Sequence, residues 1–431
     1  MPVPCVPQSC TICGSTCGTC STSTINPRID SATPWPSVCT RTGSSSAGSF
    51  VWIGIKLPTR AQALMLAEQS LPGDAPETEE DAEQKGLPDI VIHDGVTWCV
   101  LIESKVQAAL TDDQLARHGR TLRRRGFEQV HRLALTKAGV RAPRKTIALT
   151  WSKLYEWLGT TVRKSEWSER LRSYLRAAEV RLAREKYLTE GTLTMFDGFP
   201  FSSDNPYTYG EGKRLLKLAM AELRKDRSLR ALGTDPKARG RGAITGRGEN
   251  LVWDFLSLKD RPKRGAFTSY PHLTLSVHAD HLEAAITIPN GVIRPVRRGL
   301  VDLDPEGLIA HNGEILRRAR RILTRGAWVQ AYALQRHYLG QRSAAITDAR
   351  MEFKLETSQP RRAGRVKRQP EWVGLFIELL RRKRSNIQFG YAVCLPWGTK
   401  GIDSRESLRL IAEGWGAMKP LLDAVRGASD R

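Results

Sequence analysis

Apolar residues along the chain recur with two spacings, and each spacing predicts a different kind of element. Short runs with several apolar residues, such as residues 130–135 and 272–277, predict buried strands. Apolar residues that recur every three or four positions predict amphipathic helices over about 111–126 and 164–187. Turn-forming residues dominate 197–212, and we place a domain boundary there.

Beyond this boundary, strand and helix patterns follow one another without an internal repeat. The predicted strands lie near residues 250–257, 272–277, 282–288, 350–356 and 386–395. The predicted helices lie near residues 209–225, 306–323, 370–382 and 403–425. Residues 197–431 therefore form a second domain of the α+β or α/β kind.

Residues 87–105 join two apolar runs through a turn signal. The runs 90–92 and 98–102 flank Asp94-Gly95, a dipeptide that favours a β-hairpin. Both faces of both predicted strands are mainly apolar. Such strands belong in the middle of a sheet that is covered on both sides.

The ends of this predicted hairpin nevertheless carry three charged residues, Asp89, Glu103 and Lys105. Charges at the ends of buried strands are costly unless they meet one another, a metal or a ligand. A three-residue loop that ends at Gly95 pairs Asp89 with Cys99 and places all three charges on one face. A two-residue turn would put Asp89 and Glu103 on opposite faces. We predict the three-residue loop.

Two carboxylates on one face of a sheet are suited to a divalent hard cation. Mg²⁺ prefers oxygen ligands and keeps several of its waters, and Mn²⁺ can substitute for it. Such an ion polarises a phosphoryl oxygen and helps to activate a water. A lysine beside it stabilises developing negative charge. These residue types therefore predict hydrolysis of phosphodiester bonds.

The same residues resemble a known group of enzymes. Pro88-Asp89, followed after fourteen residues by Glu103-Ser104-Lys105, resembles the signature of the PD-(D/E)xK nuclease superfamily. The resemblance covers residues 59–158 and implies a restriction-endonuclease-like α/β core, a central mixed sheet flanked by helices, with the order α-β-β-β-α-β. A helix at 59–70 would open this core.

The resemblance also implies roles for individual residues. Asp89, Glu103 and the backbone carbonyl of Ile102 would bind Mg²⁺, and Lys105 would position the attacking water. RecB-like members of the superfamily carry a Gln-x-x-x-Tyr pair on the helix that follows. Here Gln114 matches the pair, and His118 stands where tyrosine would be. Glu68, on the expected first helix, is the candidate for an additional metal ligand.

Residues 1–48 differ from the rest of the chain because they are rich in Ser, Thr, Cys, Pro and Gly and show no apolar periodicity. Their composition predicts a disordered tail. Cys10, Cys13, Cys17 and Cys20 form two C-x2-C pairs, but only three residues separate the pairs, where zinc sites usually have a dozen or more. Three further parts follow the tail. We expect the nuclease-like domain at 49–160, a helical connector at 161–196 and the basic domain at 197–431.

Charge indicates the partner. The 431 residues include 67 Lys+Arg and 45 Asp+Glu, a net charge of +22, and most of the excess lies after residue 188. A chain this basic favours a polyanion, which we take to be nucleic acid, DNA rather than RNA. We expect a cytoplasmic protein without membrane spans. The residues predicted to contact phosphates are Arg117, Arg120, Arg124, Arg361, Arg362, Arg365, Lys367 and Arg368.

Two interpretations of the charged cluster stay open. The first is a metal-dependent DNA nuclease of a defence or repair system, in which Asp89, Glu103, Lys105 and Gln114 are the catalytic residues. The second is a nucleic-acid-binding or regulatory protein that uses the nuclease-like fold as a scaffold, with Lys105 in a structural ion pair. Loss of cleavage on replacing Glu103 or Lys105 distinguishes them.

Overall fold

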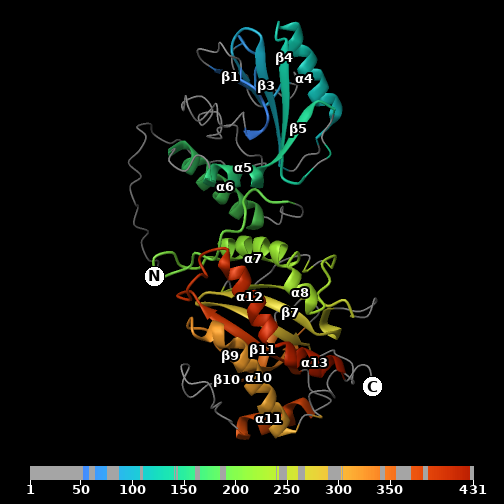
Figure 1. The fold of residues 1–431 in the computed structure, drawn as a ribbon, viewed down its shortest axis with the longest axis vertical. Coiled ribbons are helices and arrows are strands. Elements are labelled where there is room, and N and C mark those ends of the chain that lie inside the picture. Colours follow the sequence, from blue (N-terminus) through green and yellow to red (C-terminus); the bar gives the residue numbers. More distant parts are fainter. Residues whose placement is uncertain are drawn as a thin grey trace.

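Two β-sheets with helices packed against them make up the protein, a mixed α/β architecture (Figure 1). The computed structural model describes residues 52–57, 64–74, 87–106, 110–139, 141, 144–160, 166–184, 191–238, 240–241, 250–260, 267–289, 302, 304–339, 345–355, 370–381 and 387–427. The tail predicted at 1–48, with its cysteine pairs, lies outside the described residues.

The first sheet has five strands in the order β1-β2-β3-β4-β5. The first three strands pair antiparallel, and β3, β4 and β5 pair parallel. The strands are β1 (Met65–Glu68), β2 (Ile90–His93), β3 (Trp98–Lys105), β4 (Gln129–Thr136) and β5 (Thr146–Thr150). Helix α4 (Asp112–Arg124) covers one face, and α5 (Trp151–Thr160) and α6 (Glu166–Arg184) cover the other.

The prediction of a helix at 59–70 is wrong for residues 65–68. Residues 58–63 lie outside the described residues, and Met65–Glu68 form strand β1. This segment is rich in Ala, Leu, Met and Glu, which favour helix in isolation. Pairing with β2 decides the outcome, since Leu66 and Ala67 lie opposite Ile92 and Val91 in the sheet.

The loop of the β2–β3 hairpin also differs from the prediction. His93 pairs with Cys99, and the amide of Asp94 donates to the carbonyl of Trp98 at 3.1 Å. Gly95 has a positive φ of 81°, as expected of the loop glycine. The loop, however, does not end at Gly95 as predicted but continues toward Cys99. Asp89 is therefore aligned with Glu103 rather than with Cys99. Because the register differs by an even number of residues, Asp89 and Glu103 still share a face.

Helix α6, predicted as part of a connector, is packed into the core of the first sheet. Its Leu171 and Leu175 are fully buried in a cluster with Trp98 of β3 and Leu154 of α5. Figure 1 shows α5 and α6 between the first sheet and α7 (Tyr209–Leu223), which begins the second half of the chain.

The second sheet is antiparallel throughout, with the strand order β10-β9-β11-β8-β7-β6. Its strands are β6 (Leu251–Ser257), β7 (His272–His278), β8 (His281–Ile288), β9 (Trp328–Tyr338), β10 (Ala345–Leu355) and β11 (Ile387–Pro396). One face packs against helices; besides α7 these are α8 (Arg227–Ala231), α10 (Pro305–Leu323), α11 (Pro370–Arg381), α12 (Glu406–Ala417) and α13 (Lys419–Gly427).

Most elements predicted in this half are confirmed, with three differences. Strand β9 and helix α8 were not predicted, and the single helix expected at 403–425 is two helices separated at Met418.

Helices α7 and α10 begin with ordinary capping chemistry. Asp304 accepts the amide of Gly307 at 2.6 Å and Pro305 opens α10, while Thr208 caps α7.

A buried ion-pair network joins the two halves. Glu179 of α6 is fully buried and accepts the amide of Leu193 at 2.8 Å and the hydroxyl of Thr194. Arg214 of α7 is 2% exposed; it lies 3.5 Å from Glu179 and donates to Thr194 at 2.8 Å and to Glu211 at 2.5 Å. Removing one partner leaves the others buried and uncompensated.

We expect Glu179→Ala to lower the free energy of unfolding by about 3 kcal/mol. The variant leaves part of the Arg214 guanidinium, the amide of Leu193 and the hydroxyl of Thr194 without their buried acceptor. Glu166→Ala on the same helix is the control. Its pair with Arg170 is largely exposed, so the loss should stay under about 0.5 kcal/mol. Urea denaturation followed by tryptophan fluorescence measures both. Equal effects would show that the buried pair does not hold the junction.

Candidate functional site

Strand β3 delivers Glu103 and Lys105 to the face of the first sheet that packs against α4. Val91 and Leu101 on this face are buried with Leu115 of α4. Alternation along β3 places Glu103 and Lys105 on the same side as Leu101. Glu103 is completely buried, and the Lys105 side chain is 19% exposed. The apolar part of β3 is thus followed by a carboxylate that has no contact with solvent.

One oxygen of this carboxylate has two partners. The ammonium of Lys105 lies 2.6 Å from Glu103 Oε1, and the side-chain amide of Gln114 donates to the same oxygen at 2.6 Å. Both contacts are short, and both are strengthened when the carboxyl is ionised. The structure therefore brings Gln114 of the predicted helix together with Glu103 and Lys105 of the predicted strand.

The second oxygen faces a histidine. Helix α4 places His118 one turn after Gln114, on the same side. His118 is 2% exposed, and its Nε2 lies 3.9 Å from Glu103 Oε2. Neither atom has a hydrogen-bond partner among the described residues. Two buried polar atoms without hydrogen bonds are costly unless a cation, a proton or a water lies between them.

Asp89 lies just before β2 and is half-buried. Its Oδ2 accepts the backbone amide of Ser104 at 2.7 Å, which fixes Asp89 beside the end of β3. Its negative charge acts on Glu103 and raises the pKa of that carboxyl. The two carboxylates therefore repel each other, as expected of a pair that shares a cation.

Burial is the main cause of the raised pKa of Glu103, followed by the charge of Asp89, while Lys105 opposes both. Burial, with smaller contributions from the charges of Arg117 and Lys105, lowers the pKa of His118 to about 4. At neutral pH the imidazole is thus neutral and has a lone pair to offer. A cation placed near Glu103 Oε2 would offset the cost of the buried carboxylate.

His118 is the functional candidate whose role the sequence left open. Four residues after Gln114, it shares the helix face that points at Glu103. Ile102 lies in the sheet opposite Ile90 and Leu133, and the metal-binding role of its carbonyl stays a prediction of the resemblance.

Glu68 does not lie with this cluster. It ends β1 rather than a helix and pairs with Ile90, which in turn pairs with Ile102. Directly paired residues share a face of a sheet, so Glu68 is on the face opposite Glu103. The prediction of Glu68 as an additional metal ligand on a first helix is therefore wrong in its placement, and we leave it out of the site.

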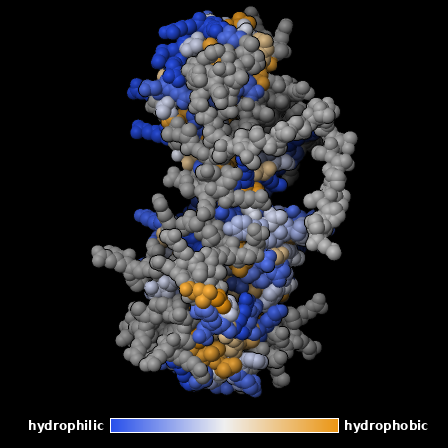
Figure 2. Space-filling view, turned by 180° about the vertical axis from the view of Figure 1, so that it is seen from behind, coloured by the Kyte–Doolittle hydropathy of each residue, from blue (hydrophilic) through white to orange (hydrophobic). Residues whose placement is uncertain are grey.

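The arginines of α4 form an exposed basic surface next to the cluster. Arg117, Arg120 and Arg124 are exposed, and the charge of Arg117 reaches His118. The end of the molecule that carries α4 in Figure 1 is largely hydrophilic in the coloured part of the rear view of Figure 2. The other predicted phosphate contacts lie outside the described residues; they are Arg361, Arg362, Arg365, Lys367 and Arg368.

Comparison with models of protein families, with curated proteins and with solved structures found no match. Within the described part of the chain, no helix is both long enough and apolar enough to cross a membrane.

The raised pKa of Glu103 predicts a pH dependence of stability in the metal-free protein. The folded state favours the protonated carboxyl, so this stabilising contribution is complete below pH 4.5 and is lost as the pH rises through the folded-state pKa. Glu103→Gln cannot ionise. Its free energy of unfolding relative to the unaltered protein should therefore increase from about pH 4.5 to about pH 8, by about 1.4 kcal/mol per unit of pKa shift.

Urea denaturation in EDTA at both pH values measures this difference. Glu156→Gln, an exposed position on α5, is the matched control and should show no such trend. A constant difference for Glu103→Gln would mean that the carboxyl is not destabilised by burial.

Proposed function

We propose that the protein is a metal-dependent nuclease that hydrolyses phosphodiester bonds, in DNA in preference to RNA. The observation that carries the proposal is the buried carboxylate of Glu103. One of its oxygens is held by Lys105 and Gln114, and the other faces His118 without a hydrogen-bond partner among the described residues. A site with this composition at the end of a central strand suits catalysis better than packing.

The arrangement of the first sheet supports the resemblance to PD-(D/E)xK nucleases. The order β1, β2, β3, α4, β4 corresponds to the β-β-β-α-β part of the restriction-endonuclease-like core. Asp89 precedes the second strand, Glu103 and Lys105 end the third, and Gln114 lies on the helix that follows. These positions support the proposal, because the resemblance implies catalytic residues on the same elements.

The donor set fits a divalent cation. Asp89 and Glu103 would hold Mg²⁺ or Mn²⁺, and the open Oε2 of Glu103 is the oxygen left for it. The neutral Nε2 of His118 on the same side adds a nitrogen donor, which favours Mn²⁺ over Mg²⁺. When bound, the ion polarises a phosphoryl oxygen and assists ionisation of a water.

The side chains around the carboxylates have separate tasks. The ammonium of Lys105 is partly exposed. It would lie close to the attacking water and would stabilise the negative charge that develops on the phosphoryl oxygens. Gln114 fixes the orientation of Glu103 through its amide. The exposed arginines of α4 supply phosphate contacts that position a strand of nucleic acid without reading its sequence.

A second candidate function is a nucleic-acid-binding scaffold without catalysis. The observation in its favour is that Lys105 already neutralises Glu103 at 2.6 Å, and that His118 replaces the tyrosine of RecB-like enzymes. The basic second half, with 42 basic and 26 acidic residues over 188–431, would then be the binding part.

Incubation with plasmid and single-stranded DNA in Mg²⁺, Mn²⁺ and EDTA tests the proposal. We expect cleavage in the metals and none in EDTA. Lys105→Ala should lower the cleavage rate by at least about 10²-fold while leaving DNA binding intact, because the lysine acts on the transition state.

Lys153→Ala, an exposed lysine on α5, is the matched control and should cleave normally. Thermal unfolding confirms that both variants are folded. Wild-type cleavage by Lys105→Ala would contradict the proposal, as would cleavage in EDTA. DNA binding without cleavage in any metal would favour the scaffold.

A further inference from the structure

The β7–β8 hairpin brings two histidines face to face, away from the nuclease-like site. Val277 pairs with Leu282, so His278 and His281 close the hairpin around the two-residue turn of Ala279 and Asp280. Their rings stack with centroids 4.3 Å apart and an interplanar angle of 11°. Two imidazolium ions would repel each other at this distance. The stacking therefore favours neutral rings.

Strand pairing adds a carboxylate and a thiol to the histidines. Glu283 follows His281 by two positions, so both side chains share a face of the sheet. Cys394 of β11 lies directly opposite Glu283. This face is the one opposite the helices, whose packing uses the alternate residues of the same strands. Three strands therefore contribute donors to one patch.

Distances within the patch suit a single metal ion. The ligand atoms of His281, Glu283 and Cys394 all lie within 4.8 Å of one another, and so do those of His278, Asp280 and His281. Nε2 of His278 is 3.9 Å from Oε2 of Glu283. Ligands at about 2.0–2.3 Å from a tetrahedral ion lie about 3.3–3.8 Å apart. To hold one ion, these side chains must therefore move closer together, and the stacked rings must turn until their nitrogens converge.

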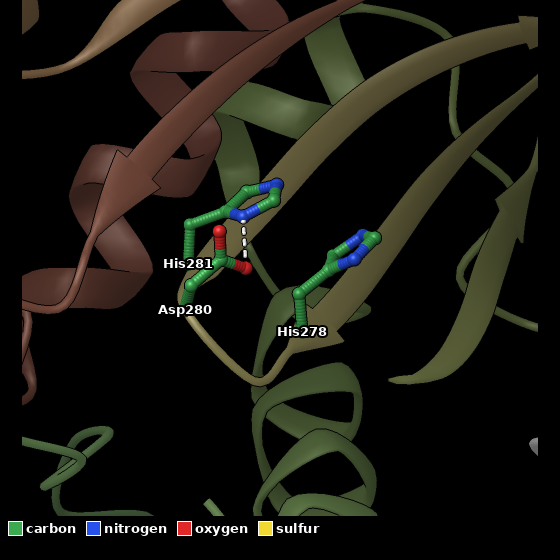
Figure 3. A group of neighbouring side chains, drawn as sticks. All are labelled: His278, Asp280 and His281. Atoms are coloured by element: carbon green, nitrogen blue, oxygen red, sulfur yellow. Dashed lines mark hydrogen bonds and ion pairs between the residues drawn. The ribbon is translucent and has the colours of Figure 1, made fainter. Parts of the chain in front are cut away.

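Hydrogen bonding orients the histidines. Nδ1 of His281 bonds to Oδ1 of Asp280 at 2.7 Å (Figure 3), which leaves Nε2 of that ring with its lone pair. A carboxylate on the far nitrogen is the usual second-shell partner of a metal-binding histidine. Nε2 of His278 is buried and has no hydrogen-bond partner among the described residues. In each ring, Nε2 is thus the candidate metal-binding nitrogen.

Burial and charge favour a cation at this place. Burial lowers the pKa of His278 to about 4, so its ring is neutral. Burial also raises the pKa of Glu283 to about 7, with Glu352 adding to the shift and Arg350 opposing it. His278 remains 22% exposed and Glu283 14% exposed, whereas Cys394 is fully buried, so solvent reaches the patch beside His278 and Glu283.

We propose that His278, His281, Glu283 and Cys394 bind one Zn²⁺ ion, with Asp280 as the hydrogen-bond partner of His281. Two imidazole nitrogens, a thiolate and a carboxylate match the borderline softness and four-coordinate geometry of zinc, whereas Mg²⁺ would take only oxygens. The ion would join β7, β8 and β11 on the face of the second sheet away from the helices. It is independent of the ion proposed at Asp89 and Glu103.

Zinc content of the purified full-length chain tests this site. The cysteines at 10, 13, 17 and 20 are replaced by serine throughout, so that the tail contributes no thiolates. After growth with zinc and extensive dialysis, elemental analysis should find about one Zn²⁺ per chain. The double variant His281→Ala/Glu283→Gln should lose it. His337→Ala, an exposed histidine of β9, is the control and should retain it.

Cobalt substitution gives a readout independent of stability. Co²⁺ in place of zinc should show the intense visible absorption of a tetrahedral site, with a thiolate charge-transfer band that Cys394→Ser removes. Glu103→Gln should leave both signals unchanged, which separates this site from the nuclease-like one. Absence of zinc from the serine-substituted chain would overturn the proposal, as would full retention of zinc by the double variant.

Discussion

A carboxylate buried at the end of β3 is the constraint on which the first half of the protein depends. Glu103 has no exposure to water, and a lone carboxylate in that position would cost several kcal/mol. Lys105 and Gln114 satisfy one oxygen, whereas the other is left facing His118. The helix α4 is therefore more than a cover for the sheet: its Gln114 amide holds one oxygen of the buried carboxylate, and its His118 faces the other.

The two halves of the protein differ in where their sheets carry polar and charged side chains. The first sheet is mainly apolar on both faces, and Asp89, Glu103 and Lys105 gather where β2 begins and β3 ends. The second sheet packs helices on one face and displays polar side chains on the other, where His278, Glu283 and Cys394 meet. The buried pair of Glu179 and Arg214 fixes the junction between them. Two unrelated groups of metal-binding residue types thus stand on two separate sheets.

The sequence predicted those parts of the fold that local pattern determines. Alternation and turn chemistry identified β2 and β3, and the spacing of Gln114 and His118 placed both on one side of α4. Predictions failed where pairing between distant strands decides the structure. Residues 65–68 have helix-favouring composition but are held as β1 by β2. The hairpin register was also wrong, because the side chain of Asp94 caps three successive amides and extends the loop.

The sites show the same division between local and long-range information. The motif around Asp89, Glu103 and Lys105 is local and could be found in the sequence. Cys394 meets Glu283 only through the register of β11 and β8, so no spacing along the chain could identify that pair. Likewise, Glu68 was excluded from the site only once its pairing with Ile90 showed which face it occupies.

The claim that Asp89 and Glu103 hold a divalent cation is tested most directly by a crystal structure of the full chain grown with Mn²⁺, using anomalous scattering of manganese. The expected result is an anomalous peak bonded to Asp89 and to Oε2 of Glu103, with Lys105 turned away from the carboxylate toward a metal-bound water. The contradictory result is an empty position there at saturating Mn²⁺, with the Lys105–Glu103 ion pair unchanged.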